Sequence, residues 1–353
     1  MSRSNQPRRP VSVPVIAGLV ALLAVAAGAA VVVRRMGRTP VQELGVYSGR
    51  HYNTDKELYR RFTEQTGIRV RLLEGKDDAL IERVRTEGAN SPADVLVLVD
   101  AARLDKAAGM DLFQPVSSKQ LDRDVPANLR DPQGRWFALT RRVRMVVVNP
   151  AMVDPATIRT YADLAKPALQ GKLCLRNNRS VYNQSLVADQ LIQRGEPATV
   201  SWIKGMVANV SQPFYTSDTP LARAVAKGEC GVALVNSYYV GRMLAGLSGE
   251  ADQSLAKQLK VVFPDPAHVN VSGAGVTRNS TQAEAATRLI EFLASPSGGE
   301  GYAEANFEYP LKGYGSSAIL KDFGPFRDDG VSVQQMGEKN RKAVELMQAN
   351  GWS

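Results

Sequence analysis

From residue 43 onward, the chain alternates short apolar runs with longer segments whose apolar residues recur every three or four positions. The runs LGVYS, IRVRLLEG and DVLVLVD are separated by DKELYRRFTEQTG and DDALIERVRTEG. In the first of these longer segments, Leu58 and Phe62 have the spacing of one helix face. This alternation predicts βαβ units and therefore a largely parallel sheet covered by helices.

A second alternation follows the extended run FALTRRVRMVVVN at 137–149 and contains KLCLR, CGVALVN and KVVFPD between helical stretches. The glycine-punctuated run HVNVSGAGV at 268–276 is extended again, and helical segments then continue to the C-terminus. Two long extended runs on either side of a complete α/β segment predict two lobes joined by two hinge-crossing strands. A ligand cleft is expected between such lobes.

The pattern also sets approximate boundaries for an α/β fold with two lobes. We expect a signal peptide or membrane anchor at 1–40, a first lobe from 41–142 and 271–325, a second lobe at 143–270, and a C-terminal helix at 326–353 packing on the second lobe. Two helix starts carry the capping-box pattern, Thr54 with Glu57 and Thr281 with Glu284.

Composition is that of a globular protein, with 44% apolar and 22% charged residues. The formal net charge of +9 suggests a nucleic-acid partner at first sight. However, the first forty residues hold six arginines and no acidic side chain, so the rest of the chain carries a net charge of only about +3. Nucleic acid is therefore not an expected partner.

The N-terminal arginines lie on both sides of the apolar run Val11 to Val33, which has the pattern of an export signal. Ala27, Gly28 and Ala29 offer a small-residue cleavage site, but the run is also long enough to span a bilayer as an anchor. No cysteine follows it, which excludes a lipoprotein anchor. Either way, the folded body is expected in the periplasm or another extracytoplasmic space.

The two cysteines, Cys174 and Cys230, then belong to an oxidising compartment. An even count there is typical of a disulfide, whereas two buried thiols in adjacent strands would give the same pattern. The sequence leaves both alternatives open, because it does not give the distance between the two Cα atoms.

Tyrosine marks three places where a strand-like run ends and a helix begins. These are GVYSGRHYNTDKE with His51 and Tyr52, LRNNRSVYNQSLVADQ with Tyr182, and GVALVNSYYVGRML with Tyr238 and Tyr239. In α/β sheets the carboxyl ends of strands form the ligand crevice, so these side chains are expected to converge. Helix N-termini also favour negative charge, which helps a phenol to ionise.

A group of phenols needs a strong Lewis acid to become phenolates at pH 7, because the ordinary pKa of tyrosine is about 10. Fe(III) is the natural candidate, since phenolate oxygens with one imidazole suit a hard trivalent ion better than zinc or copper. Four phenolates around Fe(III) leave a formal charge of about −1. Arg50, Arg179 and Arg242 lie close in sequence to these positions and would balance that charge.

Each residue also has a purely structural interpretation. Tyr182 alone is more often a half-buried aromatic residue at a helix start, and Tyr238 with Tyr239 could extend a hydrophobic strand. Asn236 and Ser237 argue against that strand, because they suit a helix cap better. His51 alone is more often a helix-cap or hydrogen-bonding histidine than a metal ligand. For the other histidine, at position 268, the structural interpretation is preferred.

Taken together, these stretches resemble the ferric-iron-binding periplasmic proteins of ABC transporters, a bacterial transferrin-like group, and most closely its cyanobacterial-type branch. The similarity runs through YSGRHYNTDKELYRRFTEQTGI, TEGANSPADVLVLVDAARL, LFQPVSS, VPANLRDPQGRWFALTRR, VYNQSLVA, VNSYYVGRML, HVNVSGAGV and NFEYP. It covers nearly the whole chain after the leader. The resemblance implies the two-lobed periplasmic binding protein fold and hinge-bending capture of Fe(III).

The resemblance also implies a ligand set. In that branch the HYN, YNQSL and SYY motifs hold the metal, and the matching positions here are His51, Tyr52, Tyr182, Tyr238 and Tyr239. Arg242 is similar to an arginine of the branch that lies behind the ligands. The sequence RNNRS carries an additional basic residue, Arg179, which leaves room for an extra anion.

The function implied is capture of Fe(III) between the lobes and delivery to the permease and ATPase of an iron importer at the inner membrane, by a monomer that is not an enzyme. One alternative is a binding protein that holds an anionic or small organic ligand through the cleft arginines. Another is an iron-dependent oxidoreductase. An esterase and a nucleotide-binding enzyme are disfavoured, because the chain lacks a G-x-S-x-G elbow, a P-loop and a Rossmann glycine fingerprint.

Overall fold

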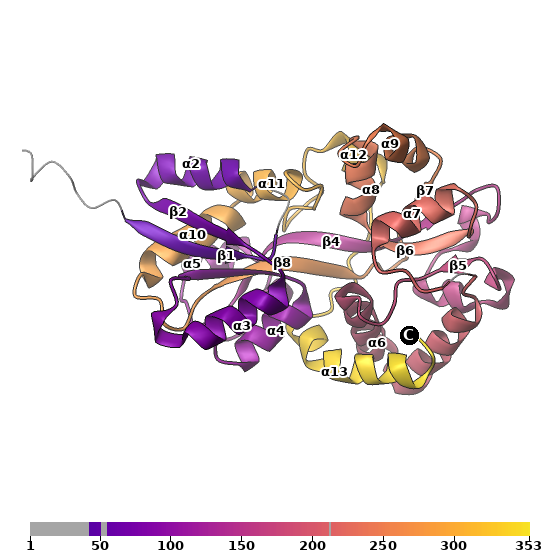
Figure 1. Ribbon diagram of the computed structural model, residues 1–353, viewed down its shortest axis with the longest axis horizontal. Helices are drawn as coiled ribbons and strands as arrows, with labels where there is room; N and C mark the ends of the chain where they lie inside the picture. The colour runs from indigo at the N-terminus through magenta and orange to yellow at the C-terminus, as the bar shows by residue number, and fades with distance from the viewer. Residues whose placement is uncertain (1–41, 51–54, 212) are drawn as a thin grey trace, which may run out of the picture. The chain divides into compact units, whose positions relative to one another are not determined.

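The computed structural model describes residues 42–50, 55–211 and 213–353 (Figure 1). The strands are β1 (Glu43–Ser48), β2 (Arg69–Glu74), β3 (Val95–Val99), β4 (Phe137–Val148), β5 (Leu173–Cys174), β6 (Val232–Asn236), β7 (Lys260–Val262) and β8 (Val269–Val276). The α-helices are α2 (Lys56–Thr66), α3 (Asp77–Glu87), α4 (Ala101–Gly109), α5 (Lys119–Asp124), α6 (Val181–Ala208), α7 (Asp218–Ala226), α8 (Ser237–Leu244), α9 (Glu250–Ala256), α10 (Ala283–Ala294), α11 (Pro296–Glu304), α12 (Ala318–Asp322) and α13 (Val333–Ala349). Short 3-10 turns cover Gly88–Asn90, Ala127–Leu129, Pro155–Thr157, Tyr161–Ala165 and Pro167–Leu169.

The strands are hydrogen-bonded in the order β2-β1-β3-β8-β4-β6-β5, and β7 also pairs with β4. The pairs β1–β2, β1–β3 and β5–β6 are parallel, as the alternating pattern predicts, whereas β8 is antiparallel to both of its neighbours. The long strand β4 pairs with β8 through Phe137–Val143 and with β6 through Arg144–Val148. Strand β4 thus passes from a first group, formed by β2, β1, β3 and β8, to a second group, formed by β5, β6 and β7. Figure 1 shows it running beside β8.

Strands β1, β3 and β8 are buried on both faces, whereas β2 at the edge of the sheet is partly exposed. Nearly every residue of β1 and β3 is buried, and the apolar faces of α2, α3, α4 and α10 join the same core. Within α2 that face is formed by Leu58, Tyr59 and Phe62, which confirms the spacing seen in the sequence. Continuous burial is expected for parallel strands that carry helices on both sides.

In the second group, β4 contributes to two separate cores because successive side chains of a strand point to opposite faces. Val146 and Val148 pack in a core with residues of α6 and α13, whereas Met145 and Val147 pack with residues of α7 and α8. The C-terminal helix α13 lies beside α6, and it also contacts α4 (Figure 1). The lobe boundaries proposed from the sequence stay predictions.

Cys174, at the end of β5, and Cys230, just before β6, form a disulfide with their Cα atoms 5.9 Å apart. Both residues are fully buried in the core that lies between β4 and α7. Of the two alternatives left open by the sequence, the structure has the disulfide. It closes the loop that contains α6 and α7, and so holds β5 beside β6.

The predicted capping box of Thr281 with Glu284 is wrong. Helix α10 begins after Gln282 rather than Thr281, and the Gln282 side chain donates to the Glu43 carbonyl and the Asp94 carboxylate. These tertiary partners compete with a local cap. Helix α2 begins after Asp55, and Glu57 forms an ion pair with Arg60 of the same helix. Thr54 lies outside the described residues, so the capping box of Thr54 with Glu57 stays a prediction.

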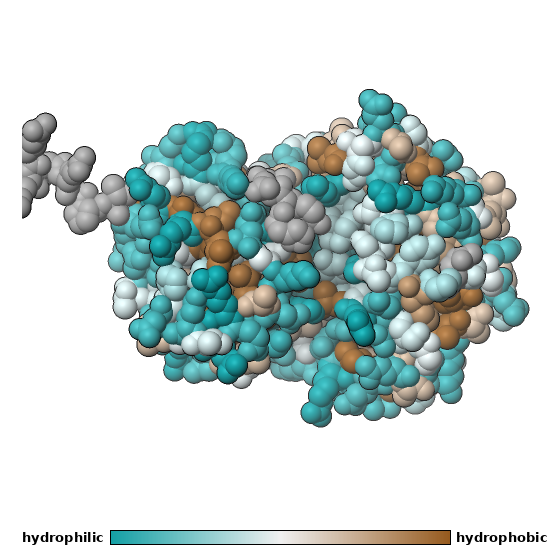
Figure 2. Space-filling model, viewed as in Figure 1, coloured by the Kyte–Doolittle hydropathy of each residue, from teal (hydrophilic) through white to brown (hydrophobic). Residues whose placement is uncertain are grey.

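The surface of the described part is largely polar. Hydrophilic residues dominate the face drawn in Figure 2, and the large hydrophobic residues that are exposed are Met110, Leu247 and Tyr314. None of the helices within 42–50, 55–211 and 213–353 has the length and apolar character needed to cross a membrane. The predicted signal peptide or membrane anchor at 1–40 lies outside the described residues.

Candidate metal centre

Two of the three predicted junctions meet in the structure. Tyr182 is in the first turn of α6, and Tyr238 and Tyr239 are in the first turn of α8. The hydroxyl of Tyr238 donates to the hydroxyl of Tyr182 over 3.1 Å, and the rings of Tyr238 and Tyr239 stack with their centroids 4.2 Å apart. We call these three residues the tyrosine cluster. They meet because β5 and β6 are parallel neighbours, so the helices that follow these strands start at the same edge.

The tyrosine cluster is partly shielded from water. Tyr238 is only 2% exposed, while Tyr182 and Tyr239 are half-buried. Asn236 and Ser237 start α8 as expected, with Asn236 at the N-cap position. The structure therefore supports a helix rather than an extension of the β6 strand at the two adjacent tyrosines. The N–H groups at both helix starts contribute partial positive charge near the phenol oxygens.

Two arginines lie over the ring of Tyr182. The guanidinium carbon of Arg142 is 5.4 Å from the ring centroid, and that of Arg176 is 5.3 Å away. Burial works against the charge on Arg142, yet electrostatic interactions with Tyr182, Glu308 and Asp100 raise its pKa above the ordinary value. Two positive charges therefore lie beside one ring of the tyrosine cluster.

A buried network holds the two helix starts together. Arg144 on β4 forms an ion pair with Asp218 and donates to the side chain of Asn183, next to Tyr182, over 2.8 Å. Asp218 also accepts the backbone N–H of Asn236 over 2.8 Å and pairs with Arg176 over 3.1 Å. One carboxylate thus ties α6, α8 and the β5 end to the same strand. The phenol positions depend on this network.

Arg50 and Arg242, two of the arginines predicted near the site, are linked through side chains of the NFEYP motif. Arg50 is 3% exposed and forms ion pairs with Asp55 over 2.9 Å and Glu308 over 2.7 Å. Glu308 accepts a hydrogen bond from Asn306, whose side-chain oxygen accepts one from Arg242, each over 3.1 Å. The chain of contacts therefore runs from α8 to the residue that precedes His51.

Three predicted site residues remain. His51 and Tyr52 lie outside the described residues, although Arg50 and Asp55 on either side of the 51–54 segment are described. Arg179 is exposed, and its backbone N–H donates to the Asn177 side chain. Its proposed role near the metal receives no support from the contacts.

Sequence reasoning missed Arg142, Arg176 and Glu308. Arg142 and Arg144 alternate along an otherwise apolar strand, and both are only 1% exposed. Charged residues at alternate positions of a buried strand are a signal that the sequence did carry. Glu308 lies in the NFEYP motif, but nothing in the sequence indicates that it meets Arg50 across 258 positions.

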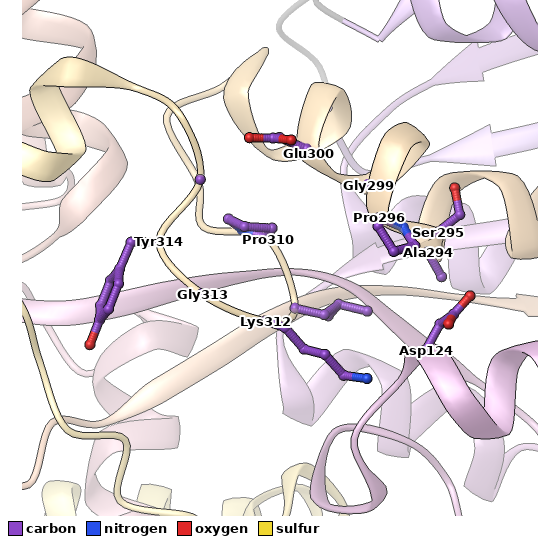
Figure 3. Close-up of a pocket in the computed structure, with 12 residues that line it drawn as sticks. Asp124, Ala294, Ser295, Pro296, Gly299, Glu300, Pro310, Lys312, Gly313 and Tyr314 are labelled. Atoms are coloured by element: carbon purple, nitrogen blue, oxygen red, sulfur yellow. The ribbon is translucent and has the colours of Figure 1, made fainter.

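A surface pocket of about 270 Å³ lies between α11 and the 310–315 segment (Figure 3). Tyr182, Tyr238 and Tyr239 are not among the described residues that line it. Lys312 at its edge donates to the Arg123 carbonyl, and Ser295 caps α11. These two polar side chains of the pocket are engaged in the fold, so the tyrosine cluster remains the candidate site.

The chain is similar to known solute-binding proteins, several of which are named for iron. Residues 90–323 match the family model of bacterial extracellular solute-binding proteins. Iron uptake protein A1 of Synechocystis sp. is 43% identical over 316 residues, which cover 88% of both chains. The Fe(3+)-binding periplasmic protein of Serratia marcescens is 29% identical and covers 88% of this chain and 90% of its own.

Solved structures agree with these relatives. The Trichodesmium protein IdiA (FutA), in complex with iron and citrate, has a TM-score of 0.85 and 41% identity over 88% of this chain and all of its own. The ferric binding protein of Campylobacter jejuni has a TM-score of 0.81 and 34% identity over the same shares. These matches confirm the predicted fold class, the two-lobed α/β fold of periplasmic binding proteins.

Proposed function

Because the chain belongs to the bacterial extracellular solute-binding proteins, we propose that it captures Fe(III) at the tyrosine cluster and delivers it to an ABC iron importer. The ligands in this proposal are the phenolates of Tyr182, Tyr238 and Tyr239, together with His51 and Tyr52 from outside the described residues. The ion is cargo, and the protein's task is to hold it tightly and to let it go at the membrane.

The observation that carries the proposal is the 3.1 Å contact between the hydroxyls of Tyr182 and Tyr238, with Tyr239 stacked beside them. Phenols with an ordinary pKa near 10 are weak ligands until a strong Lewis acid displaces their protons. Arg142 and Arg176 place two positive charges at the ring of Tyr182, where they would balance part of the negative charge of the phenolate ligands. A hard trivalent cation matches such oxygen donors.

The relatives support iron as the cargo. Iron uptake protein A1 is named for iron uptake, and the Serratia marcescens relative for Fe(3+) binding. The Trichodesmium structure holds iron and citrate. By analogy, the present protein works in the periplasm as a monomer with a permease and an ATPase as partners, and it has no enzymatic role. The export of the chain, and whether its N-terminal segment is removed or kept as a tether, stay predictions.

Metal binding would also close the two lobes, because the ligand set is drawn from both of them: the HYN motif in the first, and the three tyrosines in the second. A ligand stabilises a closed state only through its higher affinity for that state. Protons compete with the metal for phenolates, so acidification weakens binding and offers one route of release. Reduction to Fe(II), which pairs less strongly with phenolates, offers another.

A second candidate is an anion bound without iron. The Nε atoms of Arg142 and Arg176 are buried and have no hydrogen-bond partner among the described residues, which favours an acceptor nearby. Tyr182→Phe separates the two functions. An anion site keeps most of its affinity after the loss of one hydroxyl, whereas an iron site loses a ligand.

The test of the iron proposal is a visible spectrum of the purified protein after addition of ferric citrate. We expect a phenolate-to-iron charge-transfer band that disappears or shifts strongly in Tyr238→Phe. Tyr314→Phe is the matched control, because this tyrosine is 40% exposed, lies outside the cluster, and should leave the band unchanged. A colourless wild-type protein would refute the proposal, and turnover with peroxide or a reductant would refute a role in binding alone.

A further inference from the structure

A second group of ionisable side chains lies away from the tyrosine cluster. His268 immediately precedes β8, Asp189 lies on α6, and Asp329 lies in the segment that leads into α13. Their side chains are only 2%, 0% and 1% exposed. We call these three residues the His268 triad. None of them takes part in the contacts of the iron site described above.

The His268 triad has unused bonding capacity. Among the described residues, neither ring nitrogen of His268 has a hydrogen-bond partner, and the same holds for Oδ2 of Asp329. A buried polar atom without a partner destabilises the fold, so three such atoms in one place need an explanation. The other carboxylate oxygens are engaged: Asp189 accepts from Gln190 and Gln193, and Oδ1 of Asp329 accepts the Val331 N–H.

The distances between the triad's nitrogen and oxygen atoms are too long for hydrogen bonds, and they fit a shared metal cation better than a shared proton. Nδ1 of His268 is 3.9 Å from Oδ2 of Asp189 and 3.7 Å from Oδ2 of Asp329. Hydrogen bonds of this kind measure about 2.7–3.2 Å. All three ligand atoms lie within 4.8 Å of one another. The centre of such a triangle is about 2.5 Å from each corner, and Zn–N and Zn–O bonds measure about 2.0–2.2 Å, so the three side chains would move inward by a few tenths of an ångström when they bind the ion.

We propose that Asp189, His268 and Asp329 form a binding site for a divalent transition-metal cation of the Zn²⁺ type, separate from the iron site. Two carboxylates and a neutral imidazole supply a charge of −2, which a divalent ion neutralises. The imidazole nitrogen favours Zn²⁺ over Ca²⁺ or Mg²⁺, which prefer oxygen alone. The absence of a thiolate from the triad disfavours soft cations.

Neighbouring side chains are arranged as supports of such a site. Gln193 donates to both oxygens of Asp189, over 2.9 and 3.0 Å, and so fixes the carboxylate. The backbone N–H of His268 donates to the Tyr161 hydroxyl over 2.9 Å. A surface pocket of about 250 Å³ is lined by Tyr161, Gln190 and Gln193, three side chains that form hydrogen bonds with Asp189 or His268. The cation would join α6, the entry to β8 and the approach to α13.

The test is a Zn²⁺ titration of the full chain after removal of metals by a chelator, with a chromogenic chelator as competitor and thermal unfolding as a second readout. We expect one Zn²⁺ per chain and a higher Tm on loading. Asp329→Asn should lower the affinity by at least about 100-fold, and Gln193→Leu, which removes only a support, by about 10-fold. Asp265→Asn is the control, since this carboxylate lines the same pocket but is 65% exposed and outside the triad.

The proposal is independent of the iron function, and the experiment separates the two. Tyr238→Phe should keep its Zn²⁺ while it loses the iron band, and Asp329→Asn should do the reverse. Failure to bind one Zn²⁺, or equal Zn²⁺ affinity in wild type and Asp329→Asn, would overturn the triad as a metal site, as would loss of Zn²⁺ in Tyr238→Phe. If Asp329→Asn does not fold, His268→Gln replaces it with the same expected loss.

Discussion

The tyrosine cluster and the His268 triad gather side chains from distant segments in opposite electrostatic surroundings. The cluster is half-open to solvent, consists of phenols that are neutral at ordinary pH, and has two arginines at its Tyr182 ring. The triad is closed, and two of its three members are carboxylates. Neutral phenols bind a metal ion of high charge, such as Fe(III), because it displaces their protons. Buried carboxylates carry their negative charge already, and a bound cation stabilises them.

This difference matches the two proposed roles: the tyrosine cluster would hold iron as cargo, and the His268 triad would hold an ion that stabilises the fold. A site that must load and unload benefits from ligands whose affinity falls steeply when protons compete, as phenolates do. A site buried between α6, β8 and the segment before α13 exchanges its ion slowly and acts on the stability of the fold. The following predictions challenge that distinction on the tyrosine side.

The largest effect is expected for Glu308, the carboxylate that forms an ion pair with Arg50 and interacts electrostatically with Arg142. Burial alone would raise the pKa of Glu308, but the charges of Arg50 and Arg142 outweigh it and hold the pKa below its ordinary value. Glu308→Gln leaves both arginines with less compensation, so the free energy of unfolding should fall by about 3 kcal/mol at pH 7. Urea unfolding measures this loss.

The same pKa shift fixes the pH dependence. A carboxylate with a depressed pKa stabilises the fold above its unfolded pKa of about 4.3, and this contribution disappears as the pH falls through the folded value. The gap between wild type and Glu308→Gln should therefore be full at pH 7 and shrink below about pH 4. Glu345→Gln is the control, because this exposed residue should change stability by less than about 0.5 kcal/mol. A pH-independent gap would contradict an electrostatic role for Glu308.

The second effect concerns the protons that iron displaces. Each phenolate ligand makes the iron affinity rise by about tenfold per pH unit between pH 6 and 8, because its proton must leave. Tyr239→Phe should lower the affinity at pH 7 by at least about 100-fold and reduce the slope of log affinity against pH by about one. Competition with citrate at several pH values measures both. An unchanged slope would show that Tyr239 does not ligate as a phenolate.

The sequence predicted the tyrosine cluster better than the rest of the site, for a physical reason. Helix starts after buried strands are local features, and Asn236 with Ser237 marked one of them correctly. Arg142 and Arg176 reach Tyr182 only because β4, β6 and β5 lie side by side, which no local pattern encodes. The predicted crossing by β4 followed from its length, whereas the capping pattern at Thr281 yielded to tertiary partners of Gln282.

The His268 triad was beyond sequence reasoning for the same reason. His268 was interpreted as structural because it stands alone in an extended run. Asp189 resembles an ordinary polar residue of an amphipathic helix, and Asp329 one of several acids in a loop. Their convergence depends on the packing of α13 beside α6, which brings two distant segments together.

The smallest effect is expected for a cation that touches the tyrosine cluster without ligating the metal. Against the effect of burial, Asp218 and the phenols of Tyr239 and Tyr182 raise the pKa of Arg176, so this residue stays charged. Arg176→Gln should lower iron affinity by about 10-fold at pH 7, because phenolate formation loses a favourable charge. The slope against pH should stay that of wild type, since no proton-releasing ligand is lost.

Arg179→Gln is the matched control for Arg176→Gln. Both changes remove one positive charge from the same segment, but Arg179 is exposed and lies over no phenol ring of the described part of the chain, so iron affinity should change by less than about twofold. Equal losses in the two variants would mean that net charge, rather than the position of Arg176 over the Tyr182 ring, favours iron. In that case the electrostatic contrast between the cluster and the triad would not explain their different cations.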